Sequence, residues 1–317
     1  MNHYPSNVKE KLNSIILSMA EHHWLFSKNP GHDFTRQHLG KLSFYDTMHL
    51  IISMGKGSTN DEIMDYFDLD PDLIPSQSAF CQRRRQISLS AFEYLFSEFS
   101  SSFPSTTDKF KDHCILACDG CHVVYATNSD IIEDYNKPRL IDYKGYNHMH
   151  LNGFVDVISK AFLDVVIQPG QQPDEREALH SMLDHFTPDD PQKYIITADR
   201  GYESYDLLFH CELKNLGYVF RVKSPSSPKS ILSYYASEFP DDLEEFDVTI
   251  KRFFTDKATN IMKSQSDVYR YINPSKNTPH FYELLRKKHS HLYFLQFRVV
   301  KIKTAGISKT GNLFPPD

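Results

Sequence analysis

The stretch from residue 194 to residue 223, YIITADRGYESYDLLFHCELKNLGYVFRVK, decides the fold of this chain. Residues 194–198 form an apolar run too short for a helix, so they predict a buried strand that ends at Asp199. The spacing of the next apolar residues indicates a helix that Gly217 is placed to end, and residues 218–222 predict a second strand. Open α/β sheets carry their chemistry at the carboxyl ends of such strands. Asp199 is therefore the first candidate functional residue.

A second aspartate follows another apolar run. Residues 114–118 predict a buried strand that closes on Asp119. If the two strands are neighbours, Asp119 and Asp199 meet at one edge of the sheet. Paired carboxylates are the hard oxygen ligands that Mg²⁺ or Mn²⁺ prefers. Two such ions roughly 4 Å apart can activate the attacking oxygen and stabilise the leaving oxygen in phosphodiester cleavage. We therefore expect both aspartates to be catalytic and metal-binding.

The elements between the two aspartates predict an α/β fold with a mixed sheet. Residues 149–157 alternate between apolar and polar side chains, and residues 161–167 predict a further strand. Residues 174–186 indicate a helix with an acidic first turn. Three strands in succession before the crossover helix combine antiparallel neighbours with parallel ones.

Residues 1–105 differ from this pattern because their apolar residues recur at helical spacing throughout. A helix that begins near residue 76 carries Arg83, Arg84 and Arg85 in a row. Two short helices, a turn and this basic helix fit a helix-turn-helix reader of DNA, and they equally fit a small bundle with one charged face. A stretch rich in Ser, Thr and Pro at residues 101–108 predicts the domain boundary.

Charge is distributed unevenly along the chain. The whole sequence has a net charge of −6, whereas residues 250–310 contain 13 Lys and Arg against three Asp and Glu. Such a split indicates either a segment that meets a polyanion or a solvated surface. No apolar run approaches the ~20 residues of a membrane span, and the amino terminus has no apolar signal region. With five cysteines, this predicts a cytoplasmic chain with reduced thiols.

Five motifs of the chain resemble bacterial insertion-sequence transposases of the DDE superfamily. They are FTRQHLGKLSF (34–44), SAFCQRRRQI (78–87), ILACDG (115–120), TADRGYESYDLL (197–208) and LYFLQFRVVKIK (292–303). The resemblance is to the insertion-sequence-four-like branch, in which a β-rich insertion interrupts a ribonuclease-H-like domain. It implies that Asp119 and Asp199 are the first two carboxylates that bind Mg²⁺ or Mn²⁺.

The resemblance also implies an organisation and a set of partners. Residues 1–105 would be a helical DNA-binding domain, 106–223 an incomplete ribonuclease-H-like catalytic core, and 224–317 a β-rich basic insertion. The expected partner is double-stranded DNA at transposon ends and target, which places the protein at the nucleoid; a homodimer is left open, and no membrane is involved. The expected DNA-contacting residues are Arg83, Arg84, Arg85, Arg200, Tyr202, Lys301 and Lys303.

One departure from the family pattern concerns the third carboxylate. The family carries a Glu on a later helix, in the pattern Tyr-x2-Arg-x3-Glu-x6-Lys. Here Tyr218 and Arg221 have that spacing, but position 225 is Pro, and the sequence ends at Asp317 before such a helix. We therefore expect a carboxyl-truncated transposase with weakened metal binding and largely lost strand cleavage. The alternatives are a cleavage-incompetent DNA-binding protein at element ends and a general metal-dependent nuclease.

Several residues carry competing interpretations. Residues 118–122, CDGCH, fit the Cys-x-x-Cys-His pattern of haem attachment, which requires export. Glu203 could replace the missing third carboxylate, or its charge could favour the helix dipole. As for the cysteines, side chains alternate between the two faces of a strand, so the two cysteines of CDGCH would point to opposite faces. The residues considered for a zinc site are His113, Cys114, Cys118, Cys121 and His122, with His148 and His150 as further candidate ligands.

Overall fold

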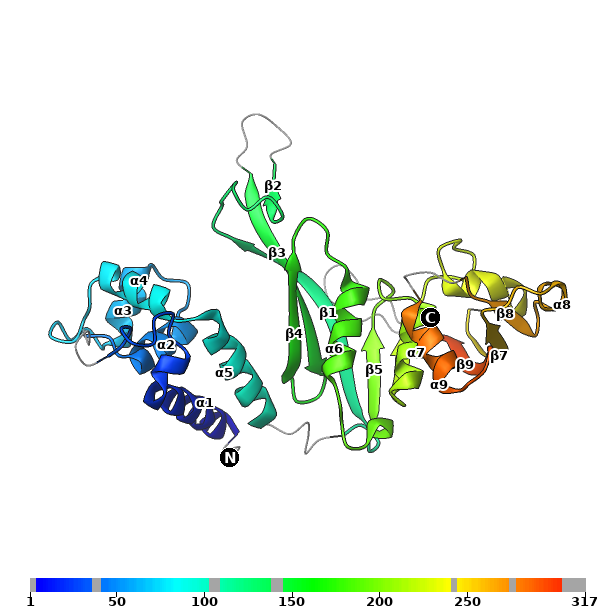
Figure 1. Ribbon diagram of the computed structural model, residues 1–317, viewed down its shortest axis with the longest axis horizontal. Coiled ribbons are helices and arrows are strands. Elements are labelled where there is room, and N and C mark those ends of the chain that lie inside the picture. Colours follow the sequence, from blue (N-terminus) through cyan, green and yellow to red (C-terminus); the bar gives the residue numbers. More distant parts are fainter. Residues whose placement is uncertain are drawn as a thin grey trace. The chain divides into compact units, whose positions relative to one another are not determined.

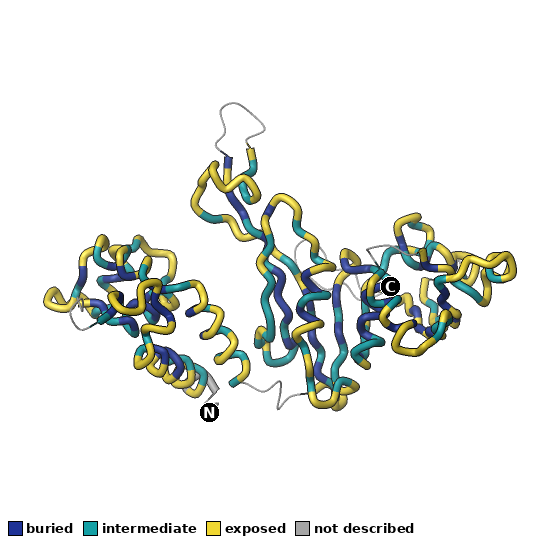
Figure 2. The backbone as a smooth tube through the Cα atoms, viewed as in Figure 1, coloured by how far each residue is buried: buried dark blue, intermediate teal, exposed yellow. Residues whose placement is uncertain are grey.

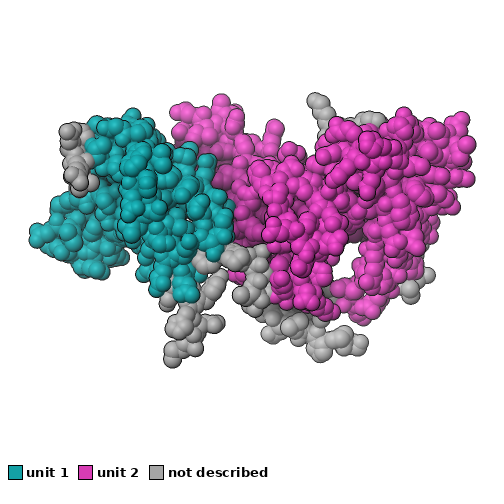
Figure 3. All heavy atoms as spheres, turned by 60° about the horizontal axis from the view of Figure 1, so that its bottom comes forward, with its two compact units in different colours: residues 1–106 teal, residues 107–317 magenta. Residues whose placement is uncertain are grey.

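The computed structural model separates the chain into two compact units, residues 1–106 and 107–317 (Figure 3). It describes residues 4–35, 41–102, 109–137, 145–240, 244–273 and 278–303. Three sequence features lie wholly or partly outside these residues: the boundary stretch 101–108, the motif 34–44 and the carboxyl-terminal residues 304–317.

The first unit is helical. Ser43 and Ser58 begin two of its helices through reciprocal capping boxes, in which each serine bonds the backbone and side chain of an aspartate three residues on. Its apolar core joins α1, α2 and α5, and a smaller cluster around Phe80 joins α2, α3 and α4. The helices are α1 (Tyr4–Glu21), α2 (Phe44–Ser53), α3 (Thr59–Tyr66), α4 (Gln77–Gln86) and α5 (Leu89–Ser102), with a short 3-10 turn η1 (His23–Leu25) after α1.

The second unit contains a mixed sheet of six strands (Figure 1). Strand β3 pairs antiparallel with β1, β4 and β2, whereas β5 pairs in parallel with β1 and β6. The antiparallel pairings of β3 on one side of β1 and the parallel pairings of β5 on the other give a ribonuclease-H-like sheet, which confirms the expected fold class. The strands are β1 (Cys114–Tyr125), β2 (Tyr135–Asn136), β3 (Tyr146–Asp156), β4 (Phe162–Pro169), β5 (Tyr194–Ala198) and β6 (Gly217–Phe220).

Helices α6 (Glu175–His185) and α7 (Tyr205–Leu213) pack with this sheet. Asp174 caps α6 by accepting from the amides of Arg176 and Glu177 at 3.1 Å each. The buried side chains of α6 recur every three or four residues, so one side of the helix is apolar, and it packs against buried residues of β1, β3 and β5. Figure 2 shows the buried stretches of the backbone in dark blue. This core contains Leu116, Phe154, Leu179, Met182, Leu183 and Ile196.

A second sheet, in the order β8-β7-β9, follows in the chain. Its core is aromatic, and α7 takes part in it: Leu208 and Phe209 pack here, whereas Leu207 and Cys211 of the same helix belong to the core of the first sheet. Helix α7 is thus buried on two sides. The elements of this region are η4 (Ile231–Glu238), β7 (Phe246–Thr255), α8 (Asn260–Ser264), β8 (Tyr269–Tyr271), α9 (Pro279–Lys287) and β9 (Leu292–Lys301), and η3 (Pro191–Lys193) precedes β5.

The structure corrects two expected boundaries. Strand β1 does not close on Asp119, because its pairing with β3 continues beyond that residue to Tyr125. Helix α7 is not ended by Gly217, which opens β6. Instead Asn215 adopts a left-handed φ of 57°, and the amides of Asn215 and Leu216 bond to carbonyls of the last helical turn at 3.1 and 2.9 Å.

The left-handed Asn215 gives a testable stability effect. Its side chain is exposed, so Asn215→Gly should leave the free energy of unfolding unchanged or slightly raised. Asn215→Ala should lower it by about 1 kcal/mol, because alanine keeps the Cβ that is strained in this conformation but lacks the short polar side chain with which asparagine tolerates it. Chemical denaturation of both variants measures the difference. Equal stability of the two variants would contradict the assigned helix end.

Candidate active site

The two aspartates lie side by side in the topology. Strands β1 and β5 pair in parallel up to Cys118 opposite Ala198. Asp119 and Asp199 are the residues that follow these two in the sequence. Both aspartates are exposed. Backbone amides orient them, because Asp119 Oδ1 accepts from Gly120 at 2.9 Å and Asp199 Oδ1 from Gly201 at 2.6 Å. One edge of the sheet therefore presents two carboxylates to solvent.

A third carboxylate, Glu175, belongs to the same site. A side chain added at Gly201 would meet Asp199 Oδ1 at 2.9 Å and Glu175 Oε2 at 3.1 Å, so both oxygens border one small space. Partial burial, and then the negative charges of Asp199 and Asp119, raise the pKa of Glu175. Sequence reasoning missed this residue. Its only signal was an acidic first turn after the third strand, which was interpreted as a helix start alone.

His150, a residue of β3, lies beside Glu175. Its Nε2 is 3.4 Å from Glu175 Oε1, yet neither ring nitrogen has a hydrogen bond within the described residues. Burial, together with His122 and His148, lowers the pKa of His150, so its ring is neutral at pH 7. Gly120 makes room for the ring, because a Cβ there would stand 2.5 Å from His150 Nε2. The site therefore contains a buried imidazole with unused bonding capacity.

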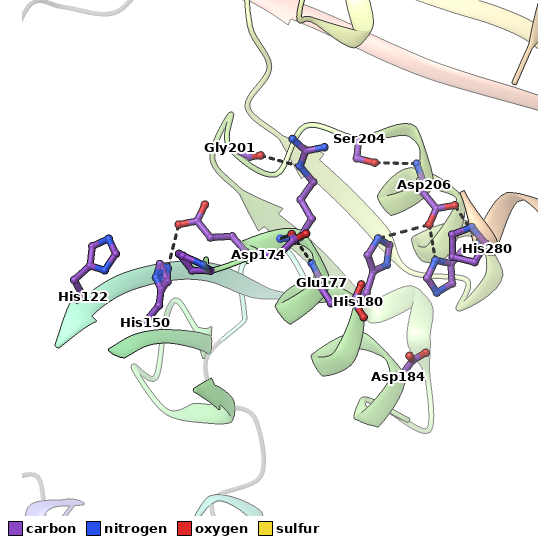
Figure 4. Close-up of a pocket in the computed structure, with 14 residues that line it drawn as sticks. His122, His150, Asp174, Glu177, His180, Asp184, Gly201, Ser204, Asp206 and His280 are labelled. Atoms are coloured by element: carbon purple, nitrogen blue, oxygen red, sulfur yellow. Dashed lines mark hydrogen bonds and ion pairs between the residues drawn. The ribbon is translucent and has the colours of Figure 1, made fainter. Parts of the chain in front are cut away.

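These side chains fit a divalent ion. Asp119, Asp199 and Glu175 supply oxygen donors of the kind that Mg²⁺ and Mn²⁺ select. Burial first, and then the charges of Asp199 and Asp119, raise the pKa of Glu175, and a bound cation would offset the repulsion between these carboxylates. A pocket of about 760 Å³ borders the site and includes His122, His150, Glu175 and Gly201 in its wall. Figure 4 shows His122 and His150 at one end of this pocket and His180, Asp206 and His280 at the other.

Tyr202 does not fit its expected contact with DNA. The side chain is fully buried, and its hydroxyl accepts from Cys118 Sγ at 3.5 Å within the core under the sheet. The expectation was wrong because the Asp-Arg-Gly-Tyr turn directs its aromatic ring inward to close the apolar core. Arg200, two residues earlier, is exposed next to Asp199.

Glu203 is not available as a metal ligand. It is buried and accepts from Ser230 Oγ at 2.7 Å and from the amides of Ile231 and Lys223 at 2.6 and 3.0 Å. It also lies 3.3 Å from Lys223 Nζ. Nor does it lie in the first turn of α7, whose cap is Ser204. Glu203 instead fastens the chain that follows β6 to the loop after β5.

The three consecutive arginines of α4 have different environments. Arg83 is only 9% exposed: its guanidinium stands 5.1 Å from the ring centre of Phe34, and Nη1 donates to Gln86 at 3.0 Å. Arg83 is therefore a packing residue, and its expected role in DNA contact is corrected. Arg84 and Arg85 are exposed. The helical period separates these neighbours, since successive residues point in different directions.

The two lysines at the end of β9 are exposed but not equally available. Lys303 Nζ pairs with Glu244 at 3.0 Å, and its amide donates to Glu245. The ammonium of Lys301 lies 5.8 Å from the ring centre of Phe246. Part of the positive charge in residues 250–303 is thus balanced locally, because Arg298 and Arg252 also pair with Asp247 and Glu238.

The cysteine motif lacks the geometry of a metal or haem site. Cys118 is buried, whereas Cys121 is exposed on the same strand. Burial raises the pKa of the Cys118 thiol to about 12, so this thiol is protonated at neutral pH in the metal-free chain. His148 and His150 are both buried on β3, and His148 Nδ1 bonds Asn136.

The sheet topology defines a ribonuclease-H-like protein, and the comparison with protein families narrows this class. The family model described as "Transposase DDE domain" matches residues 110–291, more than half of the chain. The chain belongs to this family. Membership supports a transposase function acting on DNA, and DDE transposases as a class use divalent metal ions. A search of curated proteins finds no match. Within the described residues, no helix combines the length and apolarity needed to cross a membrane.

The crowding of three carboxylates gives a stability prediction. The pKa of Glu175 is raised above its ordinary 4.5, so its ionisation weakens folding as the pH rises through that region. Glu175→Gln should therefore raise the free energy of unfolding at pH 7 without metal, by less than about 1 kcal/mol because the side chain is partly exposed. The gain should vanish well below pH 4.5. Glu177→Gln, on the same turn, is the control, and an equal gain there would refute the assignment.

Proposed function

We propose that this chain is a DNA transposase that cleaves and joins phosphodiesters at the edge of the sheet where β1 and β5 end their pairing. Asp119 and Asp199 would hold divalent ions, with Glu175 as the third carboxylate. The observation that carries the proposal is the parallel register of β1 with β5, which puts both aspartates at neighbouring positions. Bound Mg²⁺ or Mn²⁺ would polarise the scissile phosphate and activate the attacking hydroxyl.

The remaining groups of the site would position the carboxylates and the DNA. His150, buried with its Nε2 3.4 Å from Glu175 Oε1, would restrict the positions open to that carboxylate. The exposed Arg200 would contact a phosphate. The phosphodiester would be attacked first by water and then, in strand transfer, by a freed 3′-hydroxyl. The place of action would be the nucleoid, since the substrate would be DNA.

Two further regions would bind DNA in this proposal. The helical unit would recognise transposon ends through the exposed Arg84 and Arg85, and the basic region after β6 would lie along the duplex. Several cations there have no acidic neighbour in the ion pairs of the described residues, so they can neutralise phosphates. Exposed examples are Lys251, Lys257, Lys263, Lys287 and Lys288.

A second candidate function is a cleavage-incompetent protein that occupies element ends. It is favoured by Pro225, which stands where the spacing from Tyr218 and Arg221 would put the family's Glu. Glu203 does not compensate, because its oxygens already accept bonds from Lys223, Ser230 and Ile231. Glu175 offers a carboxylate from a different element. Whether it completes the site is the point on which the two candidates differ.

Cleavage of element-end DNA decides between them. We expect the full chain to nick end-containing duplex with Mg²⁺ or Mn²⁺, and Asp119→Asn, Asp199→Asn and Glu175→Gln each to reduce the rate by about 100-fold or more. Glu177→Gln is the matched control on α6. End binding without nicking would select the cleavage-incompetent protein. Equal cutting of end-containing and unrelated DNA would select a general nuclease.

The role of the helical unit has its own test. Replacing both Arg84 and Arg85 by Ala should weaken end binding and reduce the slope of log K against log salt by about 2, because each exposed arginine neutralises about one phosphate. The double variant of Lys9 and Lys11, exposed cations of α1, is the charge-matched control. Filter binding or fluorescence anisotropy at several salt concentrations gives both slopes. A comparable loss in the two double variants would argue against recognition through α4.

A further inference from the structure

Three histidines from three different helices converge at the far end of the pocket from the carboxylates. His180 lies on α6, His210 on α7 and His280 at the start of α9. One nitrogen of each ring lies within 4.8 Å of one nitrogen of the others. The rings are nearly parallel, with centres 3.9 Å apart for His210 and His280 and 4.4 Å apart for His180 and His280. His210 is almost fully buried, and the other two are mostly buried.

Two carboxylates hold the outer nitrogens of these rings. Asp206 Oδ2 lies 2.7 Å from His280 Nδ1 and 3.6 Å from His180 Nε2, and Asp184 Oδ1 lies 3.2 Å from His210 Nε2. Each ring thus has one nitrogen facing an acceptor. A histidine that ligates a metal commonly donates its other nitrogen to a carboxylate in this way.

The inner nitrogens then face one another. His180 Nδ1 and His210 Nδ1 are 2.9 Å apart. If the outer nitrogens carry the protons, both inner nitrogens present lone pairs across this short distance, which is repulsive unless a cation or a proton lies beside them.

We propose that His180, His210 and His280 form a binding site for a transition-metal ion, with Zn²⁺ as the expected occupant. Three neutral imidazoles are a zinc donor set, whereas Mg²⁺ and Mn²⁺ prefer the oxygen donors at the other end of the pocket. Zinc–nitrogen bonds of about 2.0 Å require the nitrogens to stand roughly 3.3 Å apart. Because the rings are now stacked, they would have to turn out of the stack to point these nitrogens at one ion. Water from the pocket would complete the coordination.

The role of this ion would be to fasten three helices together. Helices α6 and α7 cover the first sheet, whereas α9 belongs to the core of the second sheet. Asp206 already joins α7 to α9, because its Oδ1 accepts from the amides of His280 and Phe281 at 3.1 Å each. An ion held by all three histidines would add a link between the two cores at this end of the pocket. This inference does not depend on the chain cleaving DNA.

Zinc retention by the full chain tests the site. After removal of metal with a chelator, the chain should take up one Zn²⁺ and keep it through gel filtration, as measured by mass spectrometry of the metal. Saturation should raise the midpoint of thermal unfolding by about 5–10 °C. Co²⁺ in the same site should give visible absorption bands of a nitrogen-ligated ion. A chain that retains no zinc would overturn the proposal.

Substitutions then locate the ion. His280→Gln keeps the backbone amides that Asp206 caps, so α9 should remain folded while zinc affinity falls by about 100-fold. His180→Gln should have the same effect. His185→Gln, an exposed histidine of α6, and the double variant Asp119→Asn with Asp199→Asn should both retain zinc. Zinc retention unchanged in both His280→Gln and His180→Gln, or lost instead in His122→Gln, would refute the site.

Discussion

Residues of β1 pair in parallel with residues of β5, from Cys114 opposite Tyr194 to Cys118 opposite Ala198, and the rest of the second unit depends on this ladder. The register fixes both aspartates at the same edge, since each follows the last paired residue of its strand. It also sets the position of α6, which crosses from the antiparallel part of the sheet to the parallel part and brings Glu175 to that edge. A shift of one residue would turn one aspartate to the opposite face.

Helix α7 connects the first sheet to the rest of the second unit. Its residues divide between two cores: Leu207 and Cys211 face the first sheet, and Leu208 and Phe209 face the second. Polar residues of the same helix are buried as well, since Asp206 caps α9 and His210 lies in the histidine cluster. A helix buried in this way cannot show a single apolar stripe. Glu203 and Asp206 supply buried polar contacts on either side of its start.

Much of this organisation was predictable from the sequence because it rests on local patterns. Apolar runs located β1 and β5, and the succession of strands indicated a mixed sheet around Asp119 and Asp199. Features that depend on long-range strand pairing could not be predicted. Strand β1, for example, continues past Asp119 because β3 supplies pairing partners as far as Tyr125. The burial of single polar residues could not be predicted from the sequence either. Arg83 and Tyr202 are residue types that commonly contact DNA, but the phase of the helix buries Arg83 and a turn buries Tyr202. Glu175 reaches the site only through the packing of α6.

The division of α7 between two cores has a consequence for folding cooperativity. If the region after β6 opened by itself, Leu208 and Phe209 would be left exposed on a helix that the first sheet still holds, and the amides of α9 would lose their cap at Asp206. Partial opening is therefore penalised from both sides, so the two sheets should unfold in one transition rather than as separate modules. The region after β6 is therefore part of the scaffold that holds the carboxylates at their edge of the sheet. Its removal would loosen the core of the first sheet as well.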